Sequence, residues 1–451
     1  ICMGLYMFKS TPGTIKIAGP SAVGVVCLLA AVIGGRWVAA SSFATHLTFT
    51  GHQICFLMMA YGFIASVLPV WMVLEPRDYL STYLKLGTIG ALILGVFIVH
   101  PDIKFPAITP FMNGGGPIIK GHLFPFLFVT IACGAISGFH SLIASGTTPK
   151  MLDKESDARF IGYGAMMMES LVGVVALIAA CSMTPGDYFA INTTPEVFSK
   201  LGLHTVNLDV IAGEVGEKLA GRTGGAVSLA VGMAQIFKGI PGMQTLMGYW
   251  YHFAIMFEAL FILTTVDTGT RVARYVMQEV LGKAYKPFAN SAWLPGNLVS
   301  TALIVAAWGY MIYTGSISTI WPLFGTGNQL LATIALAVAT TFLVNMGKAR
   351  YALVTAIPMV FVGATTLTAA VLSVRDIFWP MAMNPGTHFT GYLDTVLMTI
   401  FIVGVLLVVF EAGRRCWSTL HGRPIPPEAF GSPVGHKDER PVPAGVPVGC
   451  C

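Results

Sequence analysis

Hydrophobic residues run in long stretches along the chain, and short polar segments separate them. A helix needs about 20 mostly apolar residues to cross the roughly 30 Å hydrocarbon layer of a membrane. Ten stretches reach or approach that length, and we predict a membrane-spanning helix for each of them: 19–40, 53–74, 84–100, 123–146, 161–182, 243–266, 295–313, 320–345, 352–372 and 396–413. The pattern predicts an all-α polytopic membrane protein.

The stretch 219–241 is apolar but ambiguous, and the basic residues decide how to count it. Lys and Arg collect in cytoplasmic loops. If 219–241 is an external re-entrant segment or a surface hairpin, most of the 26 Lys and Arg residues fall on one side, including those of the loop 271–286. We therefore predict that hairpin and a cytoplasmic C-terminus.

The span 123–146 contains a break at mid-depth. Its apolar start leads into Gly134, Ser137, Gly138 and His140 before apolar residues resume. Inside a membrane, irregular backbone survives only where it packs in protein or lines a wet cavity. The break predicts a binding site for a small solute. The alternative is close helix packing through Gly134 and Gly138, which have the spacing of a small-residue contact face.

Composition supports a membrane protein and excludes several other classes. Of the 451 residues, 55% are hydrophobic and 10% are charged, and the mean hydropathy is +0.73, whereas soluble domains carry about 25% charge. The net charge of +5 lies in short loops, so we expect contact with membrane lipid and no nucleic-acid partner. The eight cysteines have no metal-ligand spacing, and we predict no metal site.

The two ends of the chain differ from the middle. Ile1–Phe8 reads as the end of a span already under way, so we expect that N-terminal helices of a longer protein are missing. Residues 424–451 are rich in Pro and Gly with mixed charge, which is typical of a flexible tail. We predict a transmembrane domain over 1–423 and a flexible cytoplasmic tail over 424–451.

Four phrases of the sequence are familiar. They are YGFIASVLPVWMVLEPRDYLSTYLKLGTIG (61–90), ACGAISGFHSLIASGTTPKML (132–152), TTVDTGTRVARY (264–275) and WPLFGTGNQLLATIAL (321–336). Together they resemble the carbon starvation protein A family. The resemblance implies uptake of peptides or pyruvate, and the fold of the amino acid–polyamine–organocation superfamily, a LeuT-like bundle of two inverted five-helix repeats with two broken helices.

Within that fold, 123–146 would be the broken first helix of the second repeat. The segment 183–242 would cap the external vestibule, and the matching broken helix of the first repeat is not in this chain. A broken helix offers free N–H groups at one half and free carbonyls at the other, so it suits a carboxylate and a cation. Our substrate-binding candidates are Gly134, Ser137, Gly138, Phe139 and His140. A packed, hydrogen-bonded His140 is an equally good interpretation of that residue.

The next polar cluster along the chain, at 264–267, contains candidates for ion coupling. In sodium-coupled relatives of the fold, a neighbouring hydroxyl pair helps to coordinate the cation, which makes Thr264, Thr265 and Asp267 candidates. Asp267 could instead pair with Arg271 at a cytoplasmic helix end. Some proton-coupled members place a lysine where Lys85 falls, although Lys85 could also reach the lipid headgroups or pair with Asp78.

Four further residues have two interpretations each. Glu169 and Glu258 lie deep in spans, where an ionisable group costs at least about 2.5–3.5 kcal/mol. They are candidates for a proton relay or for structural hydrogen bonds. Asn328 and Gln329 are candidates for a gate or for contacts between helices. The segment 75–78 is expected to form a cytoplasmic ion-pair turn.

These features predict a secondary active transporter in the cell membrane, driven by a proton or sodium gradient, and the family resemblance implies that it imports peptides or pyruvate. We expect no cofactor beyond the coupling H⁺ or Na⁺, and no enzyme activity, because no nucleophile–base arrangement or metal cluster has a usable spacing. The alternatives are an amino-acid permease of the same fold, a channel, or a membrane enzyme.

Overall fold

The structure is a computed structural model that describes residues 18–422 apart from 40, 71, 147, 149–151, 291–292 and 315–316. The predicted start of the chain and the predicted tail at 424–451 lie outside the described residues. All regular elements among the described residues are helices: α2 (Ala18–Ala39), α3 (Ala44–Leu47), α4 (Gly51–Val67), α5 (Leu74–Val99), α6 (Leu123–Thr130), α7 (Ala132–Ala135), α8 (Gly138–Gly146), α9 (Asp157–Cys181), α10 (Pro185–Asn192), α11 (Pro195–Ser199), α12 (Leu208–Val215), α13 (Ala226–Lys238), α14 (Met247–Ala284), α15 (Leu294–Thr314), α16 (Ile317–Asn345), α17 (Leu353–Ser373), α18 (Trp379–Met383) and α19 (His388–Leu420).

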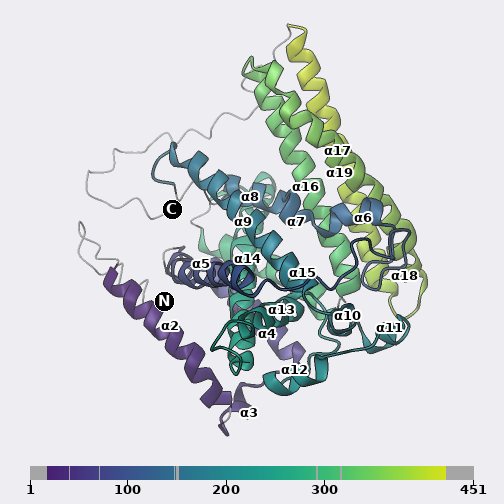
Figure 1. Cartoon of the computed structure of the whole chain (residues 1–451). Helices are drawn as coiled ribbons and strands as arrows, with labels where there is room; N and C mark the ends of the chain where they lie inside the picture. Colours follow the sequence, from purple (N-terminus) through teal and green to yellow (C-terminus); the bar gives the residue numbers. More distant parts are fainter. Residues whose placement is uncertain are drawn as a thin grey trace.

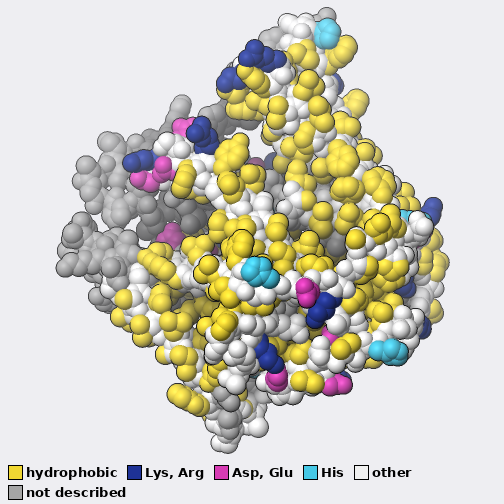
Figure 2. Space-filling view, viewed as in Figure 1, with side chains coloured by type: hydrophobic (Ala, Val, Ile, Leu, Met, Phe, Trp, Pro, Cys, Tyr) yellow, Lys and Arg dark blue, Asp and Glu magenta, His cyan; other side chains and the backbone are white. Residues whose placement is uncertain are grey.

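Eight helical segments in the described part are long and apolar enough to cross a membrane: Ser21–Ala39, Leu74–Val99, Asp157–Cys181, Met247–Ala284, Leu294–Thr314, Trp321–Asn345, Ala349–Met383 and His388–Leu420. Hydrophobic side chains cover much of the face shown in Figure 2, and charged groups on it are sparse. A surface of this kind is stable against lipid rather than water. The protein is therefore a polytopic helical membrane protein.

Several predicted spans correspond closely to helices, but others have wrong boundaries. The span predicted at 396–413, for example, is part of the longer helix α19 (His388–Leu420). The span predicted to start at residue 84 begins ten residues earlier, because α5 starts at Leu74. The preceding span ends at Val67, since Leu68 precedes a proline and adopts an extended conformation. Residues 75–78 therefore form the first turn of α5, where Pro76 is tolerated, and not a separate turn between spans.

The end of the span predicted at 243–266 is also wrong. Helix α14 continues for 38 residues to Ala284, so the predicted loop 271–286 is mostly helix. Arg271 and Arg274 are 3% and 4% exposed, and the Gln278 side chain donates a hydrogen bond to Asn297 in α15 at 2.7 Å. These contacts bury polar residues that resemble a loop in the sequence.

The segment 219–241 was predicted to be either a re-entrant segment or a surface hairpin. The surface hairpin is wrong, because helix α13 is buried. Ala230, Val231 and Ala234 in α13 are fully buried in the largest hydrophobic cluster, together with residues of α5, α9, α12 and α14. A Cβ on Gly232 would lie 2.4 Å from the Ala179 carbonyl oxygen in α9, so the two helices approach closely. At 13 residues, α13 is about 20 Å long and too short to span a membrane.

A second group of helices contains the C-terminal part of the described chain. Helices α16, α17 and α19 pack side by side and form the green-to-yellow group at the right of Figure 1. The short helices α6, α7 and α8 pack against α16 and connect this group to α9 and α14. The broken segment α6–α8 thus lies between the group α16, α17 and α19 and the helices α9 and α14.

Candidate functional site

The break predicted in the span 123–146 is present, and it is narrower than expected. The segment forms three short helices, α6, α7 and α8, and the chain leaves helical geometry at Ile131 and again at Ile136–Ser137. Gly134 therefore lies within the short helix α7 and not in unwound backbone, while Gly138 begins α8. The interrupted backbone exposes N–H and C=O groups that need partners.

Asn328 of α16 supplies partners at the second interruption. Its side-chain oxygen accepts hydrogen bonds from the Phe139 backbone N–H at 2.7 Å and from the Ser137 hydroxyl at 3.2 Å. The Ser137 oxygen also accepts the His140 backbone N–H at 3.3 Å. Asn328 is 4% exposed, and its amide nitrogen has no hydrogen-bond partner among the described residues. One buried donor thus remains beside the break.

Gln329 binds the first half of the broken segment. Its amide nitrogen donates to the Phe128 carbonyl in α6 at 2.7 Å, and its amide oxygen accepts from the Thr366 hydroxyl in α17 at 2.8 Å. Gln329 is 2% exposed. Both gating candidates therefore make hydrogen bonds between helices in this structure, which is the alternative role that the sequence left open.

Gly134 and Gly138 differ sharply, although their spacing suggested a shared packing face. A Cβ on Gly138 would lie 2.2 Å from the Asn328 carbonyl oxygen and 2.4 Å from the Ala332 nitrogen, whereas a Cβ on Gly134 would meet nothing within 4 Å. Gly138 therefore allows α8 to lie against α16. Gly134 lines a cavity instead.

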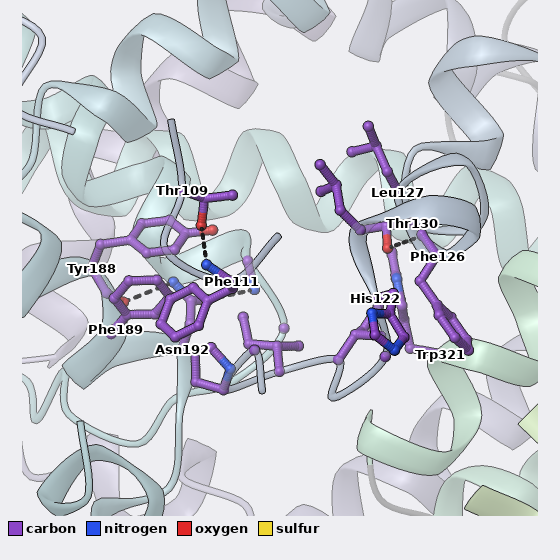
Figure 3. A pocket seen from close by; sticks show the side chains of 18 residues that line it. Thr109, Phe111, His122, Phe126, Leu127, Thr130, Tyr188, Phe189, Asn192 and Trp321 are labelled. Atoms are coloured by element: carbon purple, nitrogen blue, oxygen red, sulfur yellow. Dashed lines mark hydrogen bonds between the residues drawn. The ribbon is translucent and has the colours of Figure 1, made fainter. Parts of the chain in front are cut away.

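Two cavities lie along the broken segment. The first, about 470 Å³, is bounded by α6, α7, α9 and α16 and includes Cys133, Gly134 and Glu169 in its wall. The second, about 360 Å³, is shown in Figure 3, where aromatic residues of the loop before α6 and of α10 face Phe126 and Trp321. Thr130 and Trp321 line both cavities. Their volumes lie within the range of pockets that bind small molecules.

The second cavity combines aromatic walls with a few polar groups. Tyr188, Phe189 and Asn192 come from α10, and His122 precedes α6. Burial raises the pKa of Tyr188, so its phenol stays neutral at physiological pH. Aromatic rings with sparse polar atoms are typical of sites for small organic ligands.

Buried Asp187 holds the wall of this cavity in place, and the sequence analysis missed it. Its carboxylate accepts hydrogen bonds from the backbone N–H groups of Val206, Asn207 and Leu208, at the start of α12, at 2.8–3.2 Å. Asp187 also accepts the Thr184 hydroxyl at 2.8 Å. The signal was available, because Thr184 followed by Pro185 and Asp187 has the pattern of a helix cap.

A charge network connects α4, α5 and α14, and it contains three of the six predicted coupling residues. We define it as Arg77, Asp78, Lys85, Thr264, Asp267 and Arg271. Asp267 is fully buried, with Arg77 at 3.5 Å and Arg271 at 3.9 Å. Arg77 also pairs with Asp78 at 2.9 Å and donates to the Tyr61 hydroxyl. Arg271 donates to the Leu68 carbonyl at 3.0 Å.

Asp267 therefore does form the predicted i, i+4 pair with Arg271, but in the interior of a long helix. Its two oxygens have no hydrogen-bond partner among the described residues, so charge attraction alone stabilises it. Phe139 at the start of α8 lies 3.2 Å from the position of a Cβ on Gly269, two residues beyond Asp267. The broken segment therefore contacts α14 near Asp267 in the sequence, on a different face of the helix.

Lys85 lies inside this network and not at a helix end. Its ammonium is 3.5 Å from the Thr264 hydroxyl oxygen and 4.6 Å from the centre of the Phe261 ring. The Thr264 hydroxyl oxygen lies 3.0 Å from the Asp78 carboxylate and 2.9 Å from the Leu260 carbonyl, and its one hydrogen can be donated to either. Thr264 thus lies between Lys85 and the Asp78 carboxylate. Thr265 is exposed and donates only to the Phe261 carbonyl of its own helix. Of the predicted hydroxyl pair, Thr264 therefore belongs to the charge network and Thr265 does not.

The two deep carboxylates lie apart from the network. Glu258 in α14 is half-buried, with no hydrogen bond or ion pair to another described residue. Glu169 in α9 is exposed and lies near Cys133 and His140, with one ligand atom of each within 4.8 Å of the others. No sequence pattern predicts this cluster, because its members come from three helices and share no motif.

The fold defines the class of the protein: a polytopic helical membrane protein with a broken helix beside a buried charge network. The family model for carbon starvation protein CstA matches residues 1–369. The chain belongs to this family. No solved structure matches it.

Three relatives illustrate the family. The chain is 45% identical over 421 residues to a protein of Bacillus subtilis (strain 168) named peptide transporter CstA, covering 93% of this chain and 69% of that protein. It is 47% identical to the Escherichia coli (strain K12) protein of the same name, covering 87% and 58%. It is 41% identical to a second E. coli K12 protein, named pyruvate/proton symporter BtsT, covering 92% and 67%.

Proposed function

We propose that this chain forms most of a secondary active transporter that imports peptides, pyruvate or both across the cell membrane. The relatives named above carry transporter names, and one name specifies pyruvate and protons. The single structural observation that carries the proposal is the broken segment α6–α8, which interrupts apolar structure beside a cavity of about 470 Å³. A membrane enzyme, a channel or an amino-acid permease explains the relatives' names less well.

The two cavities suggest a route for the substrate. A small carboxylate or short peptide would enter the aromatic cavity and pass Thr130 and Trp321, which line both cavities. It would then bind at the break, near Gly134, Ser137 and the unused amide donor of Asn328. A substrate carboxylate there would accept hydrogen bonds that the helix interruption leaves available.

The charge network supports ion coupling, and we favour protons over sodium. With all groups ionised, Arg77, Lys85 and Arg271 face two carboxylates, Asp78 and Asp267. The surplus positive charge makes a sodium ion unfavourable there. Of the three basic groups, Lys85 is the one whose side chain can carry and release a proton, because arginine stays charged. The break contacts the same helix, because the Phe139 ring packs at Gly269 of α14.

The finer topology is also part of this proposal. We propose the LeuT-like fold with inverted repeats, about ten spans in this chain and a cytoplasmic C-terminus. The broken segment in the structure supports a discontinuous helix of that fold. Short helix α13 would be re-entrant, since it is buried and too short to span.

The test is uptake by proteoliposomes that contain the complete protein. Labelled pyruvate and labelled di- and tripeptides are offered under an imposed proton gradient, an imposed sodium gradient, or neither. We expect saturable uptake of at least one substrate that increases with an inward proton gradient. Saturable uptake that ignores both gradients contradicts ion coupling, and linear uptake indicates a channel.

Two variants then test the coupling residues separately. Lys85→Ala removes the ammonium beside Thr264, and Asp267→Asn removes the buried carboxylate beside Arg77. Each should reduce gradient-driven uptake more than counterflow, which needs no gradient. Normal gradient dependence in both variants would exclude these residues from coupling.

A further inference from the structure

Cys133, His140 and Glu169 come together across the break, although they lie on three different helices. Cys133 is in α7, His140 is in α8 and Glu169 is near the middle of α9. A sulfur, a ring nitrogen and a carboxylate oxygen, one from each residue, lie within 4.8 Å of one another. Among the described residues this is the one group of three or more such side chains that could hold a metal ion.

The donor set favours a particular kind of ion. Thiolate and imidazole donors select transition metals such as zinc over Mg²⁺ and Ca²⁺, which prefer oxygen. Zinc binds sulfur at about 2.3 Å, and nitrogen and oxygen at about 2.0–2.2 Å, so its tetrahedral ligands lie about 3.5 Å apart. The ligand atoms of the three exposed side chains lie within 4.8 Å of one another, and small side-chain rotations would bring them to that distance.

The surroundings leave the donors available. In the part of the chain that the structure describes, neither the His140 ring nor the Glu169 carboxylate makes a hydrogen bond or ion pair with another side chain. Cys133 makes only a long contact from its sulfur to the Ser137 hydroxyl, at 3.7 Å. A carboxylate without a cation is costly within an apolar helix, and a bound dication would remove that cost.

The cavity beside the break gives the ion a route in and an open fourth position. Cys133 and Glu169 both line the cavity of about 470 Å³, together with Gly134 and Ser170. Three protein ligands and one open position are the arrangement found in zinc sites that bind an exchangeable ligand. The fourth ligand would be water or a small anion from the cavity.

We propose that Cys133, His140 and Glu169 form a binding site for a transition-metal dication, with Zn²⁺ as the best fit. The bound ion connects α7, α8 and α9 and holds the two sides of the Ile136–Ser137 interruption at a fixed separation. This role goes beyond transport and does not depend on the substrate. Binding or loss of the metal ion would therefore change how rigidly the two sides of the break are held together.

The first test measures Zn²⁺ binding to the purified complete protein in lipid nanodiscs, in competition with a chromophoric chelator. We expect one equivalent of bound Zn²⁺. Cys133→Ser, His140→Gln and Glu169→Gln should each weaken binding by more than about tenfold, because even the loss of an outer partner of a metal ligand costs about 10–100-fold. The matched controls Cys27→Ser and Glu155→Gln change an exposed thiol and an exposed carboxylate elsewhere, and should bind as wild type.

A second measurement follows the thiol itself, in a variant that retains Cys133 as its one cysteine. Zn²⁺ should slow alkylation of Cys133 by maleimide, Mg²⁺ should not, and Glu169→Gln should abolish the protection. Absence of stoichiometric Zn²⁺ binding, or wild-type binding in all three ligand variants, would overturn the proposal. Neither measurement involves uptake, so their failure would leave the transport proposal untouched.

Discussion

The break at α6–α8 and the charge network on α5 and α14 both put polar groups inside an apolar protein, but the polar groups are of different kinds. At the break the helix is interrupted, and the backbone supplies polar groups beside a cavity. In the network α14 is continuous for 38 residues and the side chains carry the charge. Neither of the two cavities includes a network residue.

The difference suggests a division of labour. Backbone groups at an interruption can bind a solute without a permanent charge, so they suit recognition. Charged side chains in a closed network can change protonation without admitting the solute, so they suit coupling. Helix α14 joins the two regions, because Phe139 of α8 packs beside Gly269. Variants should therefore affect the two regions separately.

The largest effect is expected at the centre of the network. Asp267→Asn leaves Arg77 and Arg271 without their buried carboxylate, and should reduce the free energy of unfolding by about 3–5 kcal/mol. The measurement is thermal unfolding of the purified protein. Asp376→Asn is the matched control, because its ion pair with Arg375 is largely exposed and exposed ion pairs contribute little to stability. Equal effects of the two variants would contradict a structural role for the network.

A smaller loss of stability is expected at the break, and it should differ between the two glycines. Gly138→Ala places a Cβ against the α16 backbone, with contacts of 2.2–2.4 Å, and should cost about 1–3 kcal/mol of stability. Gly134→Ala meets nothing within 4 Å and should cost none. Both changes are followed by thermal unfolding. If Gly134→Ala destabilises as much as Gly138→Ala, the alternative of a shared packing face is correct and the assignment of Gly134 to a cavity is wrong.

The smallest effect compares two adjacent hydroxyls. Thr264→Val removes the hydroxyl between Lys85 and Asp78, at a cost of about 0.5–1.5 kcal/mol, and should alter the response of uptake to a proton gradient several-fold. Thr265→Val removes a hydroxyl that bonds only within its own helix, and should leave that response unchanged. The readout is uptake against imposed pH difference. An identical response in both variants would remove Thr264 from the coupling network.

Long apolar stretches and the helix break could be predicted from the sequence because they depend on local pattern. The spans at 161–182, 295–313 and 352–372 correspond to α9, α15 and α17. The interruption near Ser137 follows from its glycine-rich, polar residues, which have no place in an uninterrupted apolar helix.

The errors share a physical cause, which is that residues distant in the sequence bury or pair the polar groups. Asp267, Arg271 and Arg274 look like a loop until tertiary contacts bury them in α14. Lys85 looked like a helix end because its partner Thr264 is 179 positions away. The grouping of Cys133, His140 and Glu169 likewise depends on how α9 packs beside the break, which no local pattern reports.

The most direct test of substrate recognition at the break is chemical labelling at Gly134. A Gly134→Cys variant without other cysteines is treated with a maleimide in the presence and absence of the transported substrate, and Gly162→Cys, at an open position on α9, serves as the control. Substrate bound at the break predicts slower labelling at position 134 and unchanged labelling at position 162. A substrate that is transported but leaves labelling at position 134 unchanged would contradict recognition at the break.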